Sequence, residues 1–248
     1  MKRTITLFIA LAIALSMIGT AFAGKLTVAT DTNFPPFEFK DPKTGEHTGF
    51  DVELWGAIAK EIGVEYDMQP MAFKGIVPGL QSSQLDAGIA GMSVTEKRKK
   101  VIDFSDGYYD SGLLLLVRAD ETTIKDLKSL DGKIIATKQG TTSVEFLKEN
   151  ATPAETRLFP NDSAMFMELL TGGVDAVMFD KPVIESFVSK RGKDKVKIVG
   201  DLYAGQPYAI GFPKGSELVA KVNAALKALK ASGEYNTLYK KWFGVDPR

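Results

Sequence analysis

Short apolar runs alternate with longer stretches in which apolar residues recur every three or four positions over most of this sequence. The short runs are rich in β-branched and aromatic residues and end at turn residues, which predicts β-strands. Strands are therefore expected at residues 26–30, 66–71, 87–91, 113–117, 134–137, 176–179 and 208–212. The periodic stretches predict amphipathic α-helices, because a period near 3.6 places their apolar residues on one face. Helices are expected at residues 51–62, 75–81, 95–100, from 144, and at 161–170, 182–189 and 217–242.

The ends of several predicted helices carry the residues that helix ends favour. Asp51 and Glu53 place negative charge in a first turn, where it meets the positive end of the helix dipole. Asn161 is a candidate N-cap, and Pro182 stands at a position where proline favours helix opening. The last helical stretch is expected to be interrupted at residues 233–234.

Strands that alternate with helices predict an α/β fold, and the predicted elements fall into two similar sets. The first set is expected to comprise residues 24–110 and 207–248, and the second set residues 111–206, without a flexible linker between them. Two such sets predict two lobes with a cleft between them. The chain would cross between the lobes near residues 109–113 and 205–208, so hinge bending is expected there.

Polar residues follow four of the predicted strands directly, at Asp31, 91–93, 138–143 and Asp180. Ligands of open α/β sheets bind outside the carboxyl ends of the strands. These strand ends are therefore expected to outline a binding site.

The first 23 residues have the features of a secretory signal peptide. Lys2 and Arg3 give a positive start, residues 7–18 are apolar, and residues 21–23 read Ala-Phe-Ala, a small-x-small cleavage pattern. An uncleaved membrane anchor is the alternative, but the apolar run is short for a span of about 20 residues. We therefore expect cleavage after Ala23 and a periplasmic mature chain that begins at Gly24.

Composition excludes several classes of function. The 248 residues include no cysteine, so the chain has neither disulfides nor thiol chemistry. Acidic and basic residues balance at 31 each, which argues against nucleic acid or an anionic membrane surface as a partner. The one histidine, His47, lies in a turn-like stretch and is expected to be a solvated loop residue. A zinc site or a Ser-His triad is therefore not expected, nor is any other metal or cofactor.

Motifs along the whole chain resemble those of one known family. They are Val28-Ala29-Thr30-Asp31, Phe34-Pro35-Pro36-Phe37-Glu38-Phe39, Gly49-Phe50-Asp51-Val52-Glu53-Leu54, Ala90-Gly91-Met92-Ser93-Val94-Thr95-Glu96-Lys97-Arg98, Phe104-Ser105-Asp106-Gly107-Tyr108-Tyr109 and Lys240-Lys241-Trp242-Phe243-Gly244. Together they resemble the polar amino-acid class of periplasmic solute-binding proteins (family 3), and within it the glutamine-binding subgroup. The resemblance implies a two-lobed periplasmic binding protein type II fold with the ligand in the interlobe cleft. It also implies a non-enzymatic, monomeric receptor without catalytic residues, which closes about its hinge and delivers a free amino acid to an ABC permease.

The resemblance assigns the amino-acid headgroup to two charged residues. Arg98 falls where the family binds the α-carboxylate, a role that suits the rigid fork of a guanidinium. Ser93 and the backbone amide of Thr142 would complete the carboxylate contacts. Asp180 falls where the family binds the α-ammonium, with the carbonyl of Gly91 as a second acceptor. The alternatives are a solvated Arg98 beside three exposed lysines and an ordinary helix N-cap at Asp180.

The stretch Gly140-Thr141-Thr142-Ser143 before a predicted helix is typical of an anion-binding loop, because amides at a helix N-terminus lack partners. Simple N-capping by Thr142 or Ser143 is the alternative, and both can hold together. A phosphate loop is not expected, because the Gly-Lys-Ser/Thr ending is missing. Ala90 lies in the family's ligand-binding stretch, and Thr141 in this loop.

Four phenylalanines divide between pocket and core. Phe34 and Phe73 resemble the aromatics that enclose the aliphatic part of the ligand, although isolated phenylalanines more often belong to the core. Phe37 and Phe39 are assigned to the core.

The choice of amino acid is expected to depend on Asp31 and Lys138. An aspartate at position 31 suits a cationic side chain or an amide NH2, whereas an ammonium beside it repels a cation and donates to an amide oxygen. This polarity favours glutamine over arginine or lysine. Phe179 departs from the histidine of enteric glutamine binders, and residues 139–142 resemble those of cation-binding relatives.

Two other classes of function stay open. Some relatives on this scaffold are cyclohexadienyl (arogenate or prephenate) dehydratases, which need a general acid in the cleft; Asp31 or Glu145 would have to supply it. A sensor that presents its closed form to a signalling receptor is the third class, and the sequence does not separate it from a transport receptor.

Overall fold

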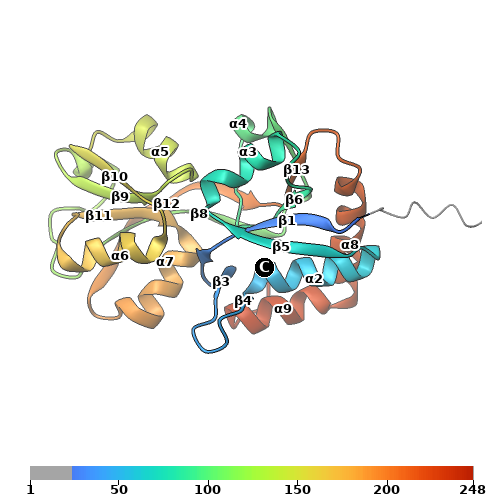
Figure 1. The fold of residues 1–248 in the computed structure, drawn as a ribbon. Helices are drawn as coiled ribbons and strands as arrows, with labels where there is room; N and C mark the ends of the chain where they lie inside the picture. The colour runs from blue at the N-terminus through green and yellow to red at the C-terminus, as the bar shows by residue number, and fades with distance from the viewer. Residues whose placement is uncertain (1–23, 248) are drawn as a thin grey trace, which may run out of the picture.

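Two five-stranded sheets organise residues 24–247, which the computed structural model describes (Figure 1). In the first sheet, β1 lies between β5 and β6 in parallel, and β13 joins antiparallel. The order of this sheet is β5 (Tyr66–Met71), β1 (Leu26–Asp31), β6 (Ala87–Gly88), β13 (Gly211–Pro213) and β7 (Ile102–Phe104). The order of the second sheet is β10 (Glu155–Phe159), β9 (Ile134–Lys138), β11 (Ala176–Asp180), β8 (Tyr109–Arg118) and β12 (Val196–Tyr208). We call the elements around these sheets the first and the second lobe.

A small antiparallel sheet of β2 (Asn33–Phe34), β3 (Glu38–Lys40) and β4 (His47–Thr48) lies beside the first sheet. The prediction that His47 is a solvated loop residue was wrong, because His47 is half-buried and pairs with Lys40 in this sheet. Burial, followed by the positive charge of Lys40, lowers the pKa of His47. The half-buried Phe39 of the same sheet packs edge-on against Trp242 at the margin of the core. Its assignment to the buried core was therefore also wrong.

Helices cover the sheets of both lobes (Figure 1). In the first lobe they are α2 (Phe50–Ile62), α3 (Ile76–Gln81), α4 (Glu96–Lys99), α8 (Leu218–Ser232) and α9 (Glu234–Phe243). In the second lobe they are α5 (Thr142–Asn150), α6 (Asp162–Thr171) and α7 (Lys181–Phe187). Two 3₁₀ turns, η2 (Phe73–Gly75) and η3 (Leu127–Leu130), and the π-helical turn η4 (Val188–Gly192) complete the helical elements of the described chain. No helix in residues 24–247 combines the length and apolarity that crossing a bilayer requires.

Local chemistry accounts for several helix ends. The Asn161 side chain accepts a hydrogen bond from the Ala164 amide at 2.9 Å, so the predicted N-cap of α6 is confirmed. Gly233 has a φ of 82°, a left-handed conformation that ends α8, and the predicted interruption is confirmed there. Helix α5 begins at Thr142 rather than Val144. Its N-cap is Thr141, so capping by Thr142 or Ser143 was a wrong expectation.

Two antiparallel strands, β8 and β12, carry the chain between the lobes. Tyr109 pairs with Tyr208, and Ser111 pairs with Gln206. The long strand β12 did not emerge from the sequence pattern, because its residues are mostly exposed and its pairing with β8 is irregular. Around the crossings, the buried ring of Phe37 lies 5.0 Å from Tyr109 and 5.4 Å from Tyr208, so its assignment to the core is confirmed.

Candidate ligand-binding site between the lobes

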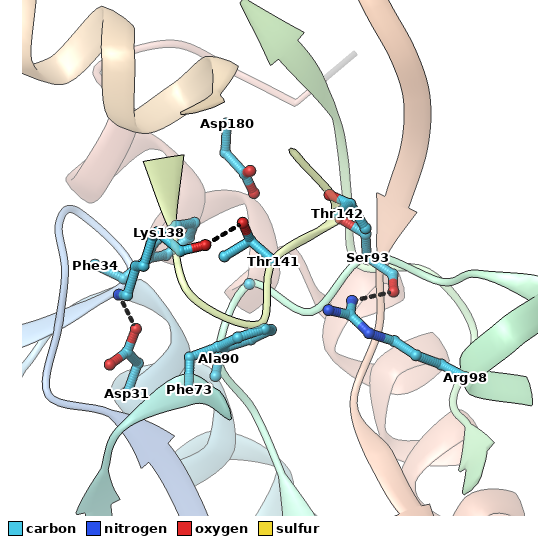
Figure 2. Close-up of a pocket in the computed structure, with 11 residues that line it drawn as sticks. Asp31, Phe34, Phe73, Ala90, Ser93, Arg98, Lys138, Thr141, Thr142 and Asp180 are labelled. Atoms are coloured by element: carbon cyan, nitrogen blue, oxygen red, sulfur yellow. Dashed lines mark hydrogen bonds and ion pairs between the residues drawn. The ribbon is translucent and has the colours of Figure 1, made fainter. Parts of the chain in front are cut away.

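A pocket lies between the lobes, at the carboxyl ends of the central strands (Figure 2). β1, β9 and β11 end at Asp31, Lys138 and Asp180, respectively, and each of these residues lines the pocket. All eleven residues expected at a site are brought together here: Asp31, Phe34, Phe73, Ala90, Gly91, Ser93, Arg98, Lys138, Thr141, Thr142 and Asp180.

Arg98 reaches the pocket from the short helix α4, whose N-cap Thr95 accepts a hydrogen bond from the Arg98 amide at 3.1 Å. Its Nη1 donates to the Ser93 carbonyl at 2.8 Å, and its Nη2 donates across the cleft to the Gly140 carbonyl at 3.1 Å. The guanidinium also lies 5.2 Å from the centre of the Phe73 ring. Arg98 therefore points into the cleft, unlike a solvated residue of a basic run.

The Arg98 guanidinium stays positively charged at neutral pH despite its burial. Burial lowers its pKa to about 10, and the negative charge of Asp180 acts in the opposite direction. Both of its hydrogen bonds go to neutral carbonyl oxygens. Its positive charge is therefore not balanced by a hydrogen-bonded anion within this set of contacts.

Asp180 presents one unpaired carboxylate oxygen to the pocket. Its Oδ2 accepts a hydrogen bond from the Tyr208 hydroxyl at 2.5 Å, whereas its Oδ1 is buried without a hydrogen-bond partner among the described residues. The Asp180 side chain makes no capping bond to α7, so an N-cap does not explain it. Burial raises its pKa to about 6, and the bond from Tyr208 and the charge of Arg98 lower it. Asp180 is therefore largely ionised at neutral pH.

At the other end of the pocket, Lys138 and Asp31 form an ion pair across the cleft, and each is only 1% exposed. Lys138 also donates to the Asn33 carbonyl at 3.0 Å and lies 5.5 Å from the Phe34 ring. The second oxygen of Asp31 accepts the Thr32 amide at 2.7 Å. Figure 2 shows this pair on one side of the pocket and Arg98 on the other, with the Asp180 carboxylate between them.

Backbone groups form much of the remaining wall. Gly91 has a φ of 51°, and a Cβ there would lie 2.3 Å from a Phe34 ring carbon, so no larger residue fits. At the start of α5, the Thr141 hydroxyl donates to the Lys138 carbonyl at 2.7 Å instead of capping the helix. Ser143 accepts a bond from the Thr137 hydroxyl at 2.9 Å. The first turn of α5 therefore has no side-chain cap, and Thr142 in that turn lines the pocket.

Several contacts at the margin of the pocket also join the lobes. Lys74 donates to Gln139 at 3.1 Å, and Asn33 donates to Ser163 at 2.9 Å. The ammonium of Lys97 lies 3.2 Å from a Glu145 carboxylate oxygen, and both side chains are exposed. The lobes are therefore closed on each other in this structure.

Sequence reasoning missed two contributors to the site, Tyr208 and Asn33. Tyr208 lies 28 positions after its partner Asp180, on the strand that returns to the first lobe. Asn33 acts through its backbone carbonyl, which residue identity does not reveal. The expected passage of the chain between the lobes at residues 205–208 could have indicated Tyr208, because a side chain at such a crossing can contact both lobes.

The family model of bacterial extracellular solute-binding proteins, family 3, matches residues 26–245. The chain belongs to this family. The resemblance drawn from the motifs is thereby confirmed, and so is the two-lobed type II binding-protein fold, which its structural neighbours share. The chain is a solute-binding protein of the amino-acid ABC transporter family.

Relatives that bind different ligands are about equally similar to this chain in sequence. The L-cystine-binding protein TcyJ of Escherichia coli (strain K12) is 32% identical over 90% of this chain and 84% of its own length. The glutamine-binding protein GlnH of Bacillus subtilis (strain 168) is 36% identical over 89% of this chain and 81% of its own. Identity at this level does not select one amino acid.

Solved structures lead to the same conclusion. An ancestral arginine-binding protein bound to glutamine has a TM-score of 0.84 and 44% identity over 90% of this chain and 100% of its own. Its arginine-bound form has a TM-score of 0.83 and 43% identity, over 89% and 99%. The ancestral amino acid-binding protein AncCDT-1, a precursor of cyclohexadienyl dehydratase, has a TM-score of 0.82 and 38% identity, over 89% and 96%.

Proposed function

We propose that this chain is a non-enzymatic receptor that binds free L-glutamine in the closed cleft and delivers it to the permease of an ABC importer. The observation that carries the choice of glutamine is the ion pair of Asp31 and Lys138 at the far end of the pocket. A carboxylate beside an ammonium offers one acceptor and one donor, and a carboxamide has the complementary NH2 and carbonyl groups.

The other end of the pocket supports an α-amino acid headgroup. Arg98 supplies a guanidinium whose present partners are two neutral carbonyls, and the first amides of α5 at Thr142 add further donors. These groups suit an α-carboxylate. The unpaired Oδ1 of Asp180 and the carbonyl of Gly91 suit the hydrogens of an α-ammonium. Phe34 and Phe73 provide apolar contacts for the carbon chain between the two ends.

The charge of the pocket favours a ligand whose side chain is neutral. Arg98 and Lys138 contribute two positive charges, and Asp31 and Asp180 contribute two negative ones. A zwitterion with a neutral side chain leaves this balance unchanged, whereas arginine or lysine adds a cation next to Lys138. In a site of low dielectric such an uncompensated charge is costly.

Arginine is the second candidate, and one further residue favours it. Asp162 is 2% exposed, its Oδ1 has no partner in the described chain, and burial raises its pKa to about 6. The charges of Lys138 and Asp31 act on this group, so the three residues lie near one another. A negative Asp162 would reduce the repulsion between Lys138 and a cationic ligand.

The surroundings of the two suggested general acids argue for binding rather than catalysis. Asp31 is paired with Lys138, and Glu145 is paired with Lys97 on the exposed rim. Asp31 is thus held in an ion pair, and Glu145 is not among the residues that line the pocket.

We further propose a periplasmic location after removal of residues 1–23, which lie outside the described residues, and action as a monomer. We also propose residues 24–110 and 207–248 as the first lobe and 111–206 as the second, hinged at β8 and β12.

Isothermal titration calorimetry on refolded, ligand-free protein tests the proposal. Glutamine, arginine, lysine, histidine, glutamate and cystine are titrated in turn. Glutamine is expected to bind most tightly, with a dissociation constant in the micromolar range, about −8 kcal/mol. Arginine binding far more tightly than glutamine would refute the choice of ligand, and turnover of prephenate or arogenate would refute the non-enzymatic role.

A further inference from the structure

Two buried carboxyl groups lie behind the pocket, outside the set of lining residues. Glu38 is on β3 and Asp51 is in the first turn of α2, and both are 0% exposed. The Oδ2 of Asp51 accepts hydrogen bonds from the Gly91 amide at 2.8 Å and from the Tyr108 hydroxyl at 2.7 Å. Both Glu38 oxygens and the Oδ1 of Asp51 find no donor among the described residues when all carboxyl groups are ionised. No part of the proposed ligand contacts explains this cluster.

The Asp51 amide donates to the carbonyl of Phe37 at 2.9 Å, which places Asp51 beside Glu38, and each of the two carboxyl groups acts on the pKa of the other. Ionised carboxylates have acceptors only, so a bond between two of them forms only when one is protonated. Asp51 already receives two donors, whereas Glu38 has none. The arrangement that satisfies every oxygen best is therefore a neutral Glu38 that donates to an anionic Asp51.

The charges around Glu38 lead to the same assignment. Burial raises the pKa of Glu38 well above its usual value, and the negative charges of Asp51 and Asp31 raise it further. Lys138 lowers it, but the ammonium of Lys138 is already paired with Asp31. Tyr108 faces Asp51 and donates to it rather than to Glu38. Within the described part of the chain, no cation thus remains to balance a second negative charge in this cluster.

We propose that Glu38 holds a proton in the folded protein and that the Glu38–Asp51 pair positions the Gly91 turn of the ligand pocket. Asp51 anchors this turn through the Gly91 amide, and Gly91 in turn contacts Phe34. Ionisation of Glu38 places two negative charges in contact in a dry site, which repels Asp51 from its position. The turn then loses its fixed acceptor, and the pocket wall formed by Gly91 and Phe34 shifts.

Infrared difference spectroscopy tests the proton directly and does not depend on any ligand. At about pH 8, well above the pKa values of Asp162 and Asp180, wild type is expected to show the C=O stretch of a protonated carboxyl group. Glu38→Gln is expected to lack this band. Glu46→Gln, which changes an exposed glutamate of the same hairpin, is the matched control and keeps it. Absence of the band in wild type, or its persistence in Glu38→Gln, overturns the proposal.

The positioning role is tested by amino-acid affinity, and this arm rests on the proposed function. Because binding requires the protonated pair, wild-type affinity is expected to fall about tenfold for each pH unit above the pKa of Glu38, relative to Glu38→Gln at the same pH. At neutral pH, Glu38→Leu, whose side chain cannot donate a hydrogen bond to Asp51, is expected to bind the amino acid about tenfold more weakly than wild type. Glu38→Gln, whose amide can donate, is expected to bind it about as tightly as wild type.

The outcomes separate this inference from the choice of ligand. Parallel pH profiles of wild type and Glu38→Gln, or unchanged affinity in Glu38→Leu, refute the positioning role even when an amino acid binds well. If no amino acid binds, the proposed function fails, while the infrared band still decides whether Glu38 is protonated. The ¹⁵N shift of the Gly91 amide provides a binding-independent check. It should change with alkaline pH in wild type and stay constant in Glu38→Gln.

Discussion

The two ends of the pocket use the same kinds of charge in opposite ways. At one end Arg98 and Asp180 do not pair with each other: the guanidinium donates to carbonyls, and one aspartate oxygen has no partner within residues 24–247. At the other end Asp31 and Lys138 neutralise each other across the cleft. In the proposed function, the first end would bind a headgroup that carries both charges, and the second end would bind a neutral group that supplies a donor and an acceptor. The separated charges would then set the class of ligand, and the paired charges would select one ligand within that class.

The largest effect is expected from Arg98→Ala, which removes the positive charge of the unpaired end. Every amino acid should bind at least about a hundredfold more weakly, because each loses its charge-assisted carboxylate contact while Asp180 loses its balancing cation. Calorimetric titration with glutamine and arginine measures the loss. Lys99→Ala, on the same helix but exposed, is the matched control and should bind like wild type. Retained affinity in Arg98→Ala would show that the two ends do not differ as described.

Asp180→Asn is expected to weaken all ligands by about thirtyfold, because the neutral amide attracts the α-ammonium less. The ligand affinity of the wild type is also expected to depend on pH through this residue. The pKa of Asp180 is about 6, so wild-type affinity should fall as the pH drops through that value and the carboxylate gains a proton. Titrations across this range should show the decline in wild type and in the exposed-site control Asp201→Asn, but not in Asp180→Asn. An identical acid decline in Asp180→Asn would assign it to another group.

Lys138→Met breaks the paired end while the headgroup contacts stay in place. The unpaired Asp31 should then favour a cationic side chain, and the ratio of glutamine to arginine affinity should fall by about tenfold or more. Competition calorimetry between the two ligands measures this ratio. Lys148→Met, an exposed change on α5 in the same lobe, should leave it unchanged. An unaltered ratio in Lys138→Met would mean that Asp31 and Lys138 do not select the ligand.

The smallest effect is expected from Tyr208→Phe, which removes only the hydroxyl that donates to Asp180. That bond lowers the pKa of Asp180, so its loss should raise the pKa and shift the acid decline in affinity to higher pH. Affinity at neutral pH should fall by roughly threefold. Glutamine titrations over a pH series detect both changes. A shift of the decline to lower pH would contradict the conclusion that this hydrogen bond lowers the pKa of Asp180.

Much of the fold was accessible from the sequence because its elements are locally determined. Strand β5 was predicted at its observed bounds, and α6 and α8 were bounded by Asn161 and Gly233, whose side-chain and backbone preferences act over a few residues. Strand β12 was missed because its exposed residues carry no hydrophobic alternation and only its pairing with β8 makes it a strand. The half-burial of Phe39 and His47 depends on where the small sheet lies on the core, which no local pattern records.

The residues of the candidate site were likewise only partly predictable from the sequence. Residues at strand ends, such as Asp31 and Asp180, were found because topology places those ends together. The Glu38–Asp51 pair was not found, although both residues stand in recognisable motifs, because their contact joins two elements through a bent hairpin. Tyr208 was likewise hidden, since its hydroxyl reaches Asp180 only when both crossings lie side by side.

If the lobes hinge at β8 and β12 as proposed, the hydrogen-bonded ladder of these strands would limit how they move. Two strands paired at Tyr109–Tyr208 and Ser111–Gln206 resist separation and twisting more than bending, so opening should follow one main coordinate. A single distance across the cleft then reports the whole motion. Because the sequence contains no cysteine, two introduced thiols would be the only labelling sites. The protein is thus a natural scaffold for an optical amino-acid sensor, in which one dye pair reads out occupancy directly.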